Sequence, residues 1–279
     1  MNKKTLILLL LLVCNAFLPP LYAQQYKVIS FNIRSNNYPH ADGVNCWNNR
    51  KDAVIKMIRN EDPMVFGLQE ALLDQLTFID NNFIRKYRRI GVGRDNGISR
   101  GEHLAIYYDY NKVDLVFQKT RWLSERPQQF SIGWDAACMR TVTIARFRIK
   151  ETGKEFLYLN THLDHVGKVA REESIKLLLK LIDQYNSDGI PVILGGDFNA
   201  TIDDDIFNPL ISANFVSARF IAKRRDYSYT YNGFGNGKPA IFDYIFVKNI
   251  QVIRFKTLVK GYGVPYISDH YPIEIIFSL

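Results

Sequence analysis

The chain alternates between short apolar runs and polar stretches, and several of the apolar runs end in a polar side chain. The run over 192–194 is followed by Gly195 and Gly196, and then by Asp197 and Asn199. Such a run predicts a buried strand, and the glycine pair permits a sharp turn close to a ligand. In extended backbone, residues two positions apart point the same way, so a carboxylate and a carboxamide should lie together. An Asx turn after the strand explains the same residues equally well.

The same pattern predicts a strand, a helix and a second strand at the start of the chain. Apolar strands over 26–34 and 64–70 flank a helical period over 47–59, and they carry Asn32 and Glu70 at their ends. The last strand, over 268–277, is expected at a sheet edge. The sequence shows no internal repeat or linker, so one domain is the simplest description. Further strands are predicted over 102–108, 113–117, 141–149, 155–165, 241–247, 252–259 and 268–277, and helices over 72–83 and 172–185.

The first 23 residues have a different pattern, which is typical of a secretory signal. Two lysines precede an apolar run over 6–13, and Leu21-Tyr22-Ala23 resembles a cleavage site. The run is too short for a membrane span. We therefore expect cleavage after Ala23, no transmembrane segment afterwards, and export to the periplasm or the cell exterior. A lipid anchor at Cys14 is the weaker alternative, because Val13 stands where a small residue would be needed.

Length and net charge restrict the possible fold classes and partners less than the hydrophobic pattern does. Removing 23 of the 279 residues leaves 256, which is typical of one large α/β or β-sandwich domain over 24–279, and we expect a monomer. The net charge of +8 falls to +6 without the two signal lysines, which favours anionic partners without choosing among nucleic acid, phospholipid and small phosphates. An oxidising compartment permits a disulfide between Cys46 and Cys138 but does not require one, and their spacing does not match a thiolate zinc site.

Polar residues in or just beyond the apolar runs supply the groups that metal-assisted attack on a phosphate ester requires. Each one alone is explained as a cap, a turn or a satisfied core group. Together they offer oxygen ligands for Mg²⁺, imidazoles to move protons and amides to hold phosphate oxygens. They are Asn32, Glu70, Asn160, His162, Asp197, Asn199, Asp243, Asp269 and His270.

Six short motifs around these residues resemble, in the same order, those of the endonuclease/exonuclease/phosphatase family. This family includes DNase I, exonuclease III, abasic-site endonucleases, inositol polyphosphate 5-phosphatases, neutral sphingomyelinases and deadenylases. The resemblance implies a DNase I-like fold, a four-layer α/β/β/α sandwich of two mixed β-sheets flanked by helices. The motifs are Ser-Phe-Asn at 30–32, Gly-Leu-Gln-Glu at 67–70, Asn-Thr-His-Leu-Asp at 160–164, Gly-Gly-Asp-Phe-Asn at 195–199, Phe-Asp-Tyr-Ile at 242–245 and Ser-Asp-His at 268–270.

The resemblance also implies a metal site. Glu70 would be the main Mg²⁺ ligand, with Asn32 and Asp269 near the same ion, and Mn²⁺ is the expected substitute. Asp197 and Asn199 would contact the attacking water, the scissile phosphate or a second metal.

The histidines would move protons. His270, paired with Asp243, would be the general base or a stabiliser of the transition state. His162 would give a proton to the leaving oxygen, with Glu102 as its partner. The residues implied to contact phosphate oxygens are Arg140, Asn160 and Asn199.

The implied activity is Mg²⁺-dependent hydrolysis of a phosphate ester. We favour a diester, in a nuclease-like or phospholipid substrate, over a monoester of the inositol or sugar phosphate type. A basic groove from 85–100 and 223–225 would indicate a nucleic-acid substrate, and exposed aromatic residues at Trp134 and 227–231 would indicate a phospholipid or an inositol phosphate. The competing class is a binding protein that has kept the scaffold, which the complete set of site residues disfavours.

Overall fold

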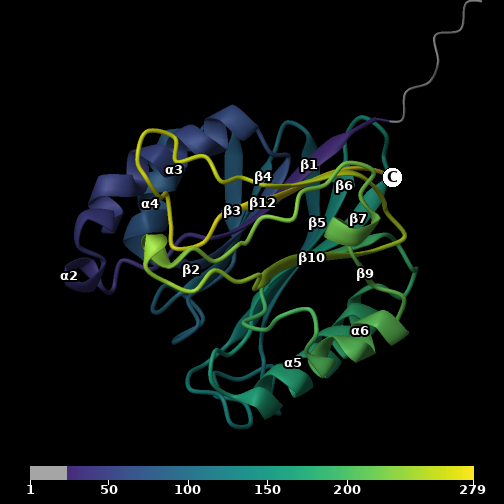
Figure 1. The fold of residues 1–279 in the computed structure, drawn as a ribbon. Helices are drawn as coiled ribbons and strands as arrows, with labels where there is room; N and C mark the ends of the chain where they lie inside the picture. The colour runs from purple at the N-terminus through teal and green to yellow at the C-terminus, as the bar shows by residue number, and fades with distance from the viewer. Residues whose placement is uncertain (1–23) are drawn as a thin grey trace, which may run out of the picture.

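Two six-stranded β-sheets pack face to face in the computed structural model of the chain, and helices cover their outer faces (Figure 1). The structure describes residues 24–279, so the secretory signal predicted over 1–23 lies outside the described residues. The four-layer α/β/β/α arrangement confirms the predicted fold class. None of the helices in the described part combines the length and the apolar character needed to span a bilayer.

The first sheet contains the predicted strand–helix–strand unit. Strands β1 and β2 pair in parallel, and the helix between them, α3 (Trp47–Glu61), packs on the outer face of this sheet. The other strands of this sheet are antiparallel to their neighbours. The strand order is β11 (Gln251–Thr257), β12 (Ile273–Ser278), β1 (Tyr26–Asn32), β2 (Val65–Ala71), β4 (His103–Asp109) and β3 (Tyr87–Ile90).

The second sheet repeats this plan. Strands β7 and β8 pair in parallel, with α5 (Lys168–Tyr185) between them in sequence and packed on the outer face. Strand β10 runs antiparallel to β8. Its first residue, Asp243, lies opposite Asp197, the last residue of β8. The strand order is β5 (Val113–Trp122), β6 (Thr141–Ile149), β7 (Glu155–His162), β8 (Val192–Asp197), β10 (Asp243–Lys248) and β9 (Val216–Ser217).

The remaining helical segments are all shorter than α3 and α5, and the longest of them is α4 (Leu73–Phe83). Helix α4 packs beside α3 on the first sheet, with Leu76 and Ile79 in the same apolar cluster as Phe66 of β2. The segments are α2 (Pro39–Asp42), α4 (Leu73–Phe83), α6 (Asn208–Ser212) and α7 (Ala218–Ile221), with 3₁₀ turns η1 (Gly43–Asn45), η2 (Asp205–Phe207) and η3 (Gly233–Gly235).

Two expectations differ from the structure, and one short strand was not predicted. The last strand, β12, lies inside the first sheet between β11 and β1, so its predicted edge position is wrong. The basic segment at 85–89 overlaps the edge strand β3, because Tyr87 is buried under the helices and Ile90 between the sheets, while Arg88 is exposed and Arg89 pairs with Asp80. Helix α5 begins at Lys168, before the predicted start at 172. Cys46 and Cys138 are both free thiols.

Candidate active site

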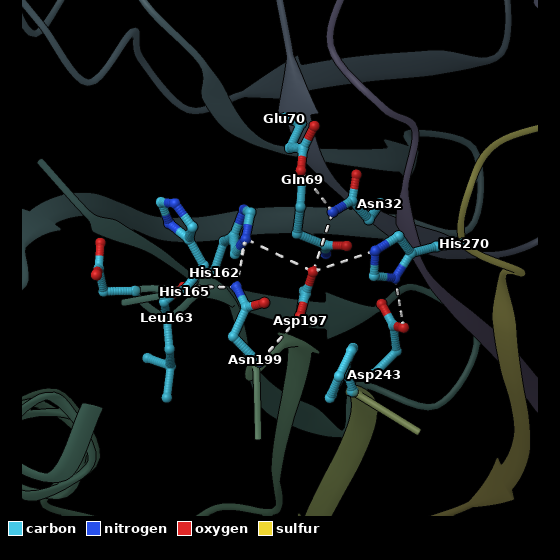
Figure 2. A network of polar contacts seen from close by, with 12 residues as sticks. Asn32, Gln69, Glu70, His162, Leu163, His165, Asp197, Asn199, Asp243 and His270 are labelled. Atoms are coloured by element: carbon cyan, nitrogen blue, oxygen red, sulfur yellow. Dashed lines mark hydrogen bonds and ion pairs between the residues drawn. The ribbon is translucent and has the colours of Figure 1, made fainter. Parts of the chain in front are cut away.

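Strand ends from both sheets open onto one cleft with a volume of ≈ 530 Å³. The parallel pairs β1/β2 and β7/β8 bring their carboxyl ends to the same rim, and β10 and β12 begin there. Most of the residues predicted for the site therefore meet, as Figure 2 shows. Those that line the cleft are Glu70, Glu102, Arg140, His162, Asp197, Asn199, Asp269 and His270.

Asn32 joins the two sheets beneath the cleft. Its Nδ2 donates hydrogen bonds to Glu70 Oε1 and to Asp197 Oδ2, each at 3.0 Å (Figure 2). Its Oδ1 accepts the backbone N–H of Arg34 at 3.0 Å. Asn32 thus orients a carboxylate from each sheet, and its predicted role as a metal ligand stays a prediction.

A local irregularity directs Glu70 into the cleft. The pairing of β2 with β4 shifts register between Leu68 and Ala71, and Glu70 has a left-handed φ of 62°. Such bulges redirect a side chain, and the strained backbone is held by its surroundings. Glu70 Oε2 accepts the N–H of Ser35 at 3.1 Å. Burial alone would raise the pKa of Glu70, but the bonds from Asn32 and Ser35 lower it below its ordinary value.

His270 and Asp243 form the predicted pair. His270 Nδ1 lies 2.8 Å from Asp243 Oδ2, and His270 Nε2 faces Asp197 Oδ2 at 3.7 Å. Burial would lower the pKa of His270, but the two carboxylates raise it well above its ordinary value. Burial raises the pKa of Asp197 to about 7, even though the charge of His270 lowers it. The geometry therefore supports an imidazolium between two carboxyl groups.

His162 has a different environment from the one predicted. Asn199 Nδ2 contacts its Nε2 at 3.0 Å and also donates to Leu163 O, while Asp197 Oδ2 lies 3.5 Å from the same ring nitrogen. Because an amide N–H can only donate, Nε2 is the acceptor. Burial, together with the charge of Arg140, lowers the pKa of His162 well below its ordinary value.

The predicted pairing of His162 with Glu102 is not formed. Glu102 Oε2 instead accepts a hydrogen bond from Arg94 Nη1 at 2.6 Å, because this guanidinium lies closer to the carboxylate. His162 Nδ1 has no hydrogen-bond partner among residues 24–279. Glu102 still lines the cleft, beside its arginine.

Arginines surround the catalytic groups, and only one of them was predicted. Arg140 lines the cleft while its Nε binds Asp164 Oδ2 at 3.2 Å and its Nη2 contacts His165 at 3.0 Å. Arg34 and Arg94 line the same cleft and were missed by the sequence analysis. Two features of the sequence could have indicated them. Arg34 follows Asn32 by two positions, and Arg94 lies in a glycine-rich loop whose backbone can approach a ligand closely.

Asn160 does not contact the cleft, which corrects its predicted role in binding phosphate. Its side chain is fully buried between the sheets, where Nδ2 donates to Leu68 O at 2.8 Å and to Ala105 O at 2.9 Å. Its Oδ1 accepts from Gln69 Nε2 at 2.7 Å. Asn160 faces the same way as His162 but lies two residues deeper along β7, so it ties the sheets together.

The residues present fit a hard divalent cation. Glu70 and Asp269 line the cleft and offer carboxylate oxygens, the donors that Mg²⁺ prefers. Burial raises the pKa of Asp269, the charge of His270 lowers it and the charge of Glu70 raises it again. The two carboxylates are therefore close enough to repel, and a cation between them would remove this repulsion.

A second acidic cluster fits a metal less well. Ligand atoms of Asp197, Asp243 and His270 lie within 4.8 Å of one another. However, His270 Nδ1 and Asp243 Oδ2 are bonded to each other, so those two atoms are already engaged. Glu70 and Asp269 are therefore the better candidates for metal ligands, because a carboxylate oxygen that accepts one hydrogen bond keeps a second lone pair, whereas His270 Nδ1 has none to spare.

Comparisons with known proteins agree on one family. The sequence model described as Endonuclease/Exonuclease/phosphatase family matches residues 29–270. An endonuclease/exonuclease/phosphatase from Bacteroides vulgatus is 32% identical, with a TM-score of 0.86 and coverage of 92% of this chain and 99% of that one. A mannosyl-6-phosphatase from Bacteroides thetaiotaomicron is 32% identical, with a TM-score of 0.86 and coverage of 91% and 100%.

A more distant relative is Nocturnin from Drosophila melanogaster, which is 26% identical over 73% of this chain. The match covers 33% of Nocturnin, so the chain spans about a third of that protein.

Proposed function

Because this chain belongs to the endonuclease/exonuclease/phosphatase family and is a metal-dependent phosphoesterase, we propose that it hydrolyses the phosphate monoester of a sugar. One observation carries the choice of a monoester: Arg34, Arg94 and Arg140 all line the cleft that holds the catalytic carboxylates and histidines. A monoester phosphate carries about −1.5 to −2 charges at neutral pH, more than a diester, and guanidinium groups match its oxygens.

The likeness to the mannosyl-6-phosphatase supports the sugar, because it extends over the whole length of that protein. A hexose 6-phosphate is accordingly the substrate with which we would begin.

The diester favoured by the sequence fits the cleft less well. A nucleic-acid substrate would need a positive track along the phosphate backbone. Of the two basic segments, only Arg94 lines the cleft. Two of the others are neutralised by local partners: Lys86 forms an ion pair with Asp62, and Arg89 with Asp80 at 3.0 Å.

The side chains divide the chemistry among them. Glu70 and Asp269 would hold Mg²⁺, or Mn²⁺ in its place, and this ion would supply positive charge next to the phosphate oxygens. Asp197 takes a proton from the attacking water, and the imidazolium of His270, held by Asp243, donates to a non-bridging oxygen.

The leaving alcohol then needs a proton. His162 supplies it: this residue is neutral in the free protein, and the negative charge of a bound phosphate beside it favours its protonated form. The products are inorganic phosphate and the sugar alcohol. The secretory pattern over 1–23 supports the further proposal that this reaction takes place outside the cytoplasm.

The direct test compares rates of hydrolysis by the purified protein with Mg²⁺ present. It measures inorganic phosphate from mannose 6-phosphate and glucose 6-phosphate, p-nitrophenol from bis(p-nitrophenyl) phosphate, and strand cleavage of plasmid DNA. We expect a hexose 6-phosphate to have the highest kcat/KM and an His270→Ala variant to lose the activity. Faster hydrolysis of a diester would overturn the monoester proposal. Equal activity in wild type and in His270→Ala on every substrate would overturn the assignment of the site.

A further inference from the structure

We infer that the alcohol released from the substrate is an oligosaccharide, whose terminal sugar bears the phosphate and whose next sugar occupies a second cavity beside the catalytic cleft. This inference rests on the proposed function and specifies its substrate. The second cavity has a volume of ≈ 590 Å³.

The two hollows share one wall. Tyr231 and Phe242 line both the catalytic cleft and the second cavity, and their ring centroids are 5.8 Å apart. The Tyr231 ring also meets the His270 ring edge-on, with centroids 5.0 Å apart. A ligand that leaves the cleft over this wall therefore passes from the catalytic imidazole directly into the second cavity.

Backbone hydrogen bonds fix the wall relative to the catalytic residues. Tyr231 N donates to Ala240 O at 2.9 Å, and Tyr231 forms a β-bridge to His270. Next to it, Tyr271 N donates to Thr230 O at 2.6 Å. The wall is thus part of the same rigid assembly as the catalytic pair, which is what a specificity site requires.

The lining of the second cavity matches the two kinds of surface of a sugar ring. Aromatic and aliphatic side chains, including Tyr229 and Ile202, form most of it, and an aromatic face attracts the C–H face of a pyranose. Thr201, Asp203 and Lys238 add polar groups for the ring hydroxyls.

These polar groups distinguish a sugar from an alkyl chain. The side chains of Asp203 and Lys238 line the second cavity and are exposed to solvent. A sugar would give both of them partners, whereas an alkyl chain would cover them without replacing their contacts with water.

The test compares mannose 6-phosphate with a mannose disaccharide that carries the phosphate on C6 of one ring. In the wild-type protein we expect kcat/KM to be about tenfold higher for the disaccharide, a modest gain for one added stacking contact. The variants Tyr229→Ala and Lys238→Ala should lower this ratio, mainly by raising KM for the disaccharide. Tyr227→Ala is the matched control, because its ring is 66% exposed and lines neither hollow.

The outcomes separate the two proposals. Two results overturn the oligosaccharide assignment alone. One is an equal kcat/KM for the phosphorylated disaccharide and mannose 6-phosphate, and the other is an unchanged preference for the disaccharide in both Tyr229→Ala and Lys238→Ala. A gain for decyl phosphate over ethyl phosphate that Tyr229→Ala removes would overturn it in favour of an alkyl group. Hydrolysis of neither sugar phosphate would overturn the sugar monoester function as well.

Discussion

His270 and Asp243 lie 2.8 Å apart although they belong to different sheets: His270 precedes β12 of the first sheet, and Asp243 opens β10 of the second. The catalytic pair therefore exists only while the two sheets are packed in register. Asn32, which bonds to Glu70 and Asp197, crosses the same boundary.

Replacing Asp243 by asparagine should lower kcat by a factor of about 10² to 10⁴, because a neutral carboxamide does not stabilise the imidazolium of His270. Steady-state hydrolysis of a hexose 6-phosphate measures the effect. Asp188→Asn is the control, since this carboxylate is half exposed and pairs with Arg146 on the surface. A kcat near that of the wild type would show that the pair is structural only.

Glu70→Gln should raise the Mg²⁺ concentration for half-maximal activity about tenfold or more, because a carboxylate ligand is lost. Titration of activity with Mg²⁺ after removal of bound metal by EDTA measures this change. Glu173→Gln on α5, where the glutamate pairs with Lys176, should behave as wild type. An unchanged Mg²⁺ dependence in Glu70→Gln would place the metal elsewhere.

Arg94→Gln should lower kcat/KM for a phosphate monoester about 10- to 100-fold, the value of one hydrogen bond to a charged group. The loss should be smaller for a diester, which carries less charge. Arg88→Gln is the matched control, because its guanidinium stacks on Tyr110 and does not line the cleft. Equal losses on both ester types would indicate that Arg94 acts only by holding Glu102.

Asn160→Ala should lower the free energy of unfolding by about 2–4 kcal/mol, because it leaves buried partners on Gln69, Leu68 and Ala105 without a bond. Urea unfolding measures this loss. Asn236→Ala, at an exposed turn, should change it by less than about 0.5 kcal/mol. A stable Asn160→Ala protein with a raised KM would restore the phosphate-binding role predicted from sequence.

Asp164 should make stability depend on pH in the acid range. Burial would raise the pKa of Asp164, but the N–H groups of Gly167, Ala137 and Val166 lower it well below its ordinary value. Its pKa is then lower in the folded than in the unfolded chain, so its contribution is complete above about pH 4 and is lost as the pH falls further. The difference in unfolding free energy between wild type and Asp164→Asn should accordingly be large at pH 7 and shrink toward pH 2. A constant difference would contradict this assignment.

The sequence predicted the strands and their polar ends because apolar runs report burial directly. It could not place β12 inside its sheet, since periodicity shows which face of a strand is buried but not how many neighbours pair with it. The basic run around Tyr87 similarly concealed the short edge strand β3.

Depth and loop geometry explain the differences at the site. Asn160 and His162 follow the same alternation along one strand, so their spacing predicts a shared direction but not that only His162 reaches the rim. Arg34 and Arg94 lie on loops, whose course depends on tertiary contacts that no local pattern encodes. The pairing of Glu102 with His162 is implied by the family resemblance, which carries no information about Arg94, the residue that binds Glu102 in this chain.

The pairing of β1 with β12, in which Tyr26 lies opposite Phe277, has a consequence for biosynthesis. Synthesis proceeds from the N-terminal end, yet Asp269 and His270 lie just before the strand that pairs with β1. A nascent chain can fold its second sheet early but cannot hydrolyse anything until this strand has emerged. The enzyme is therefore inactive throughout its own translation, with no inhibitor needed.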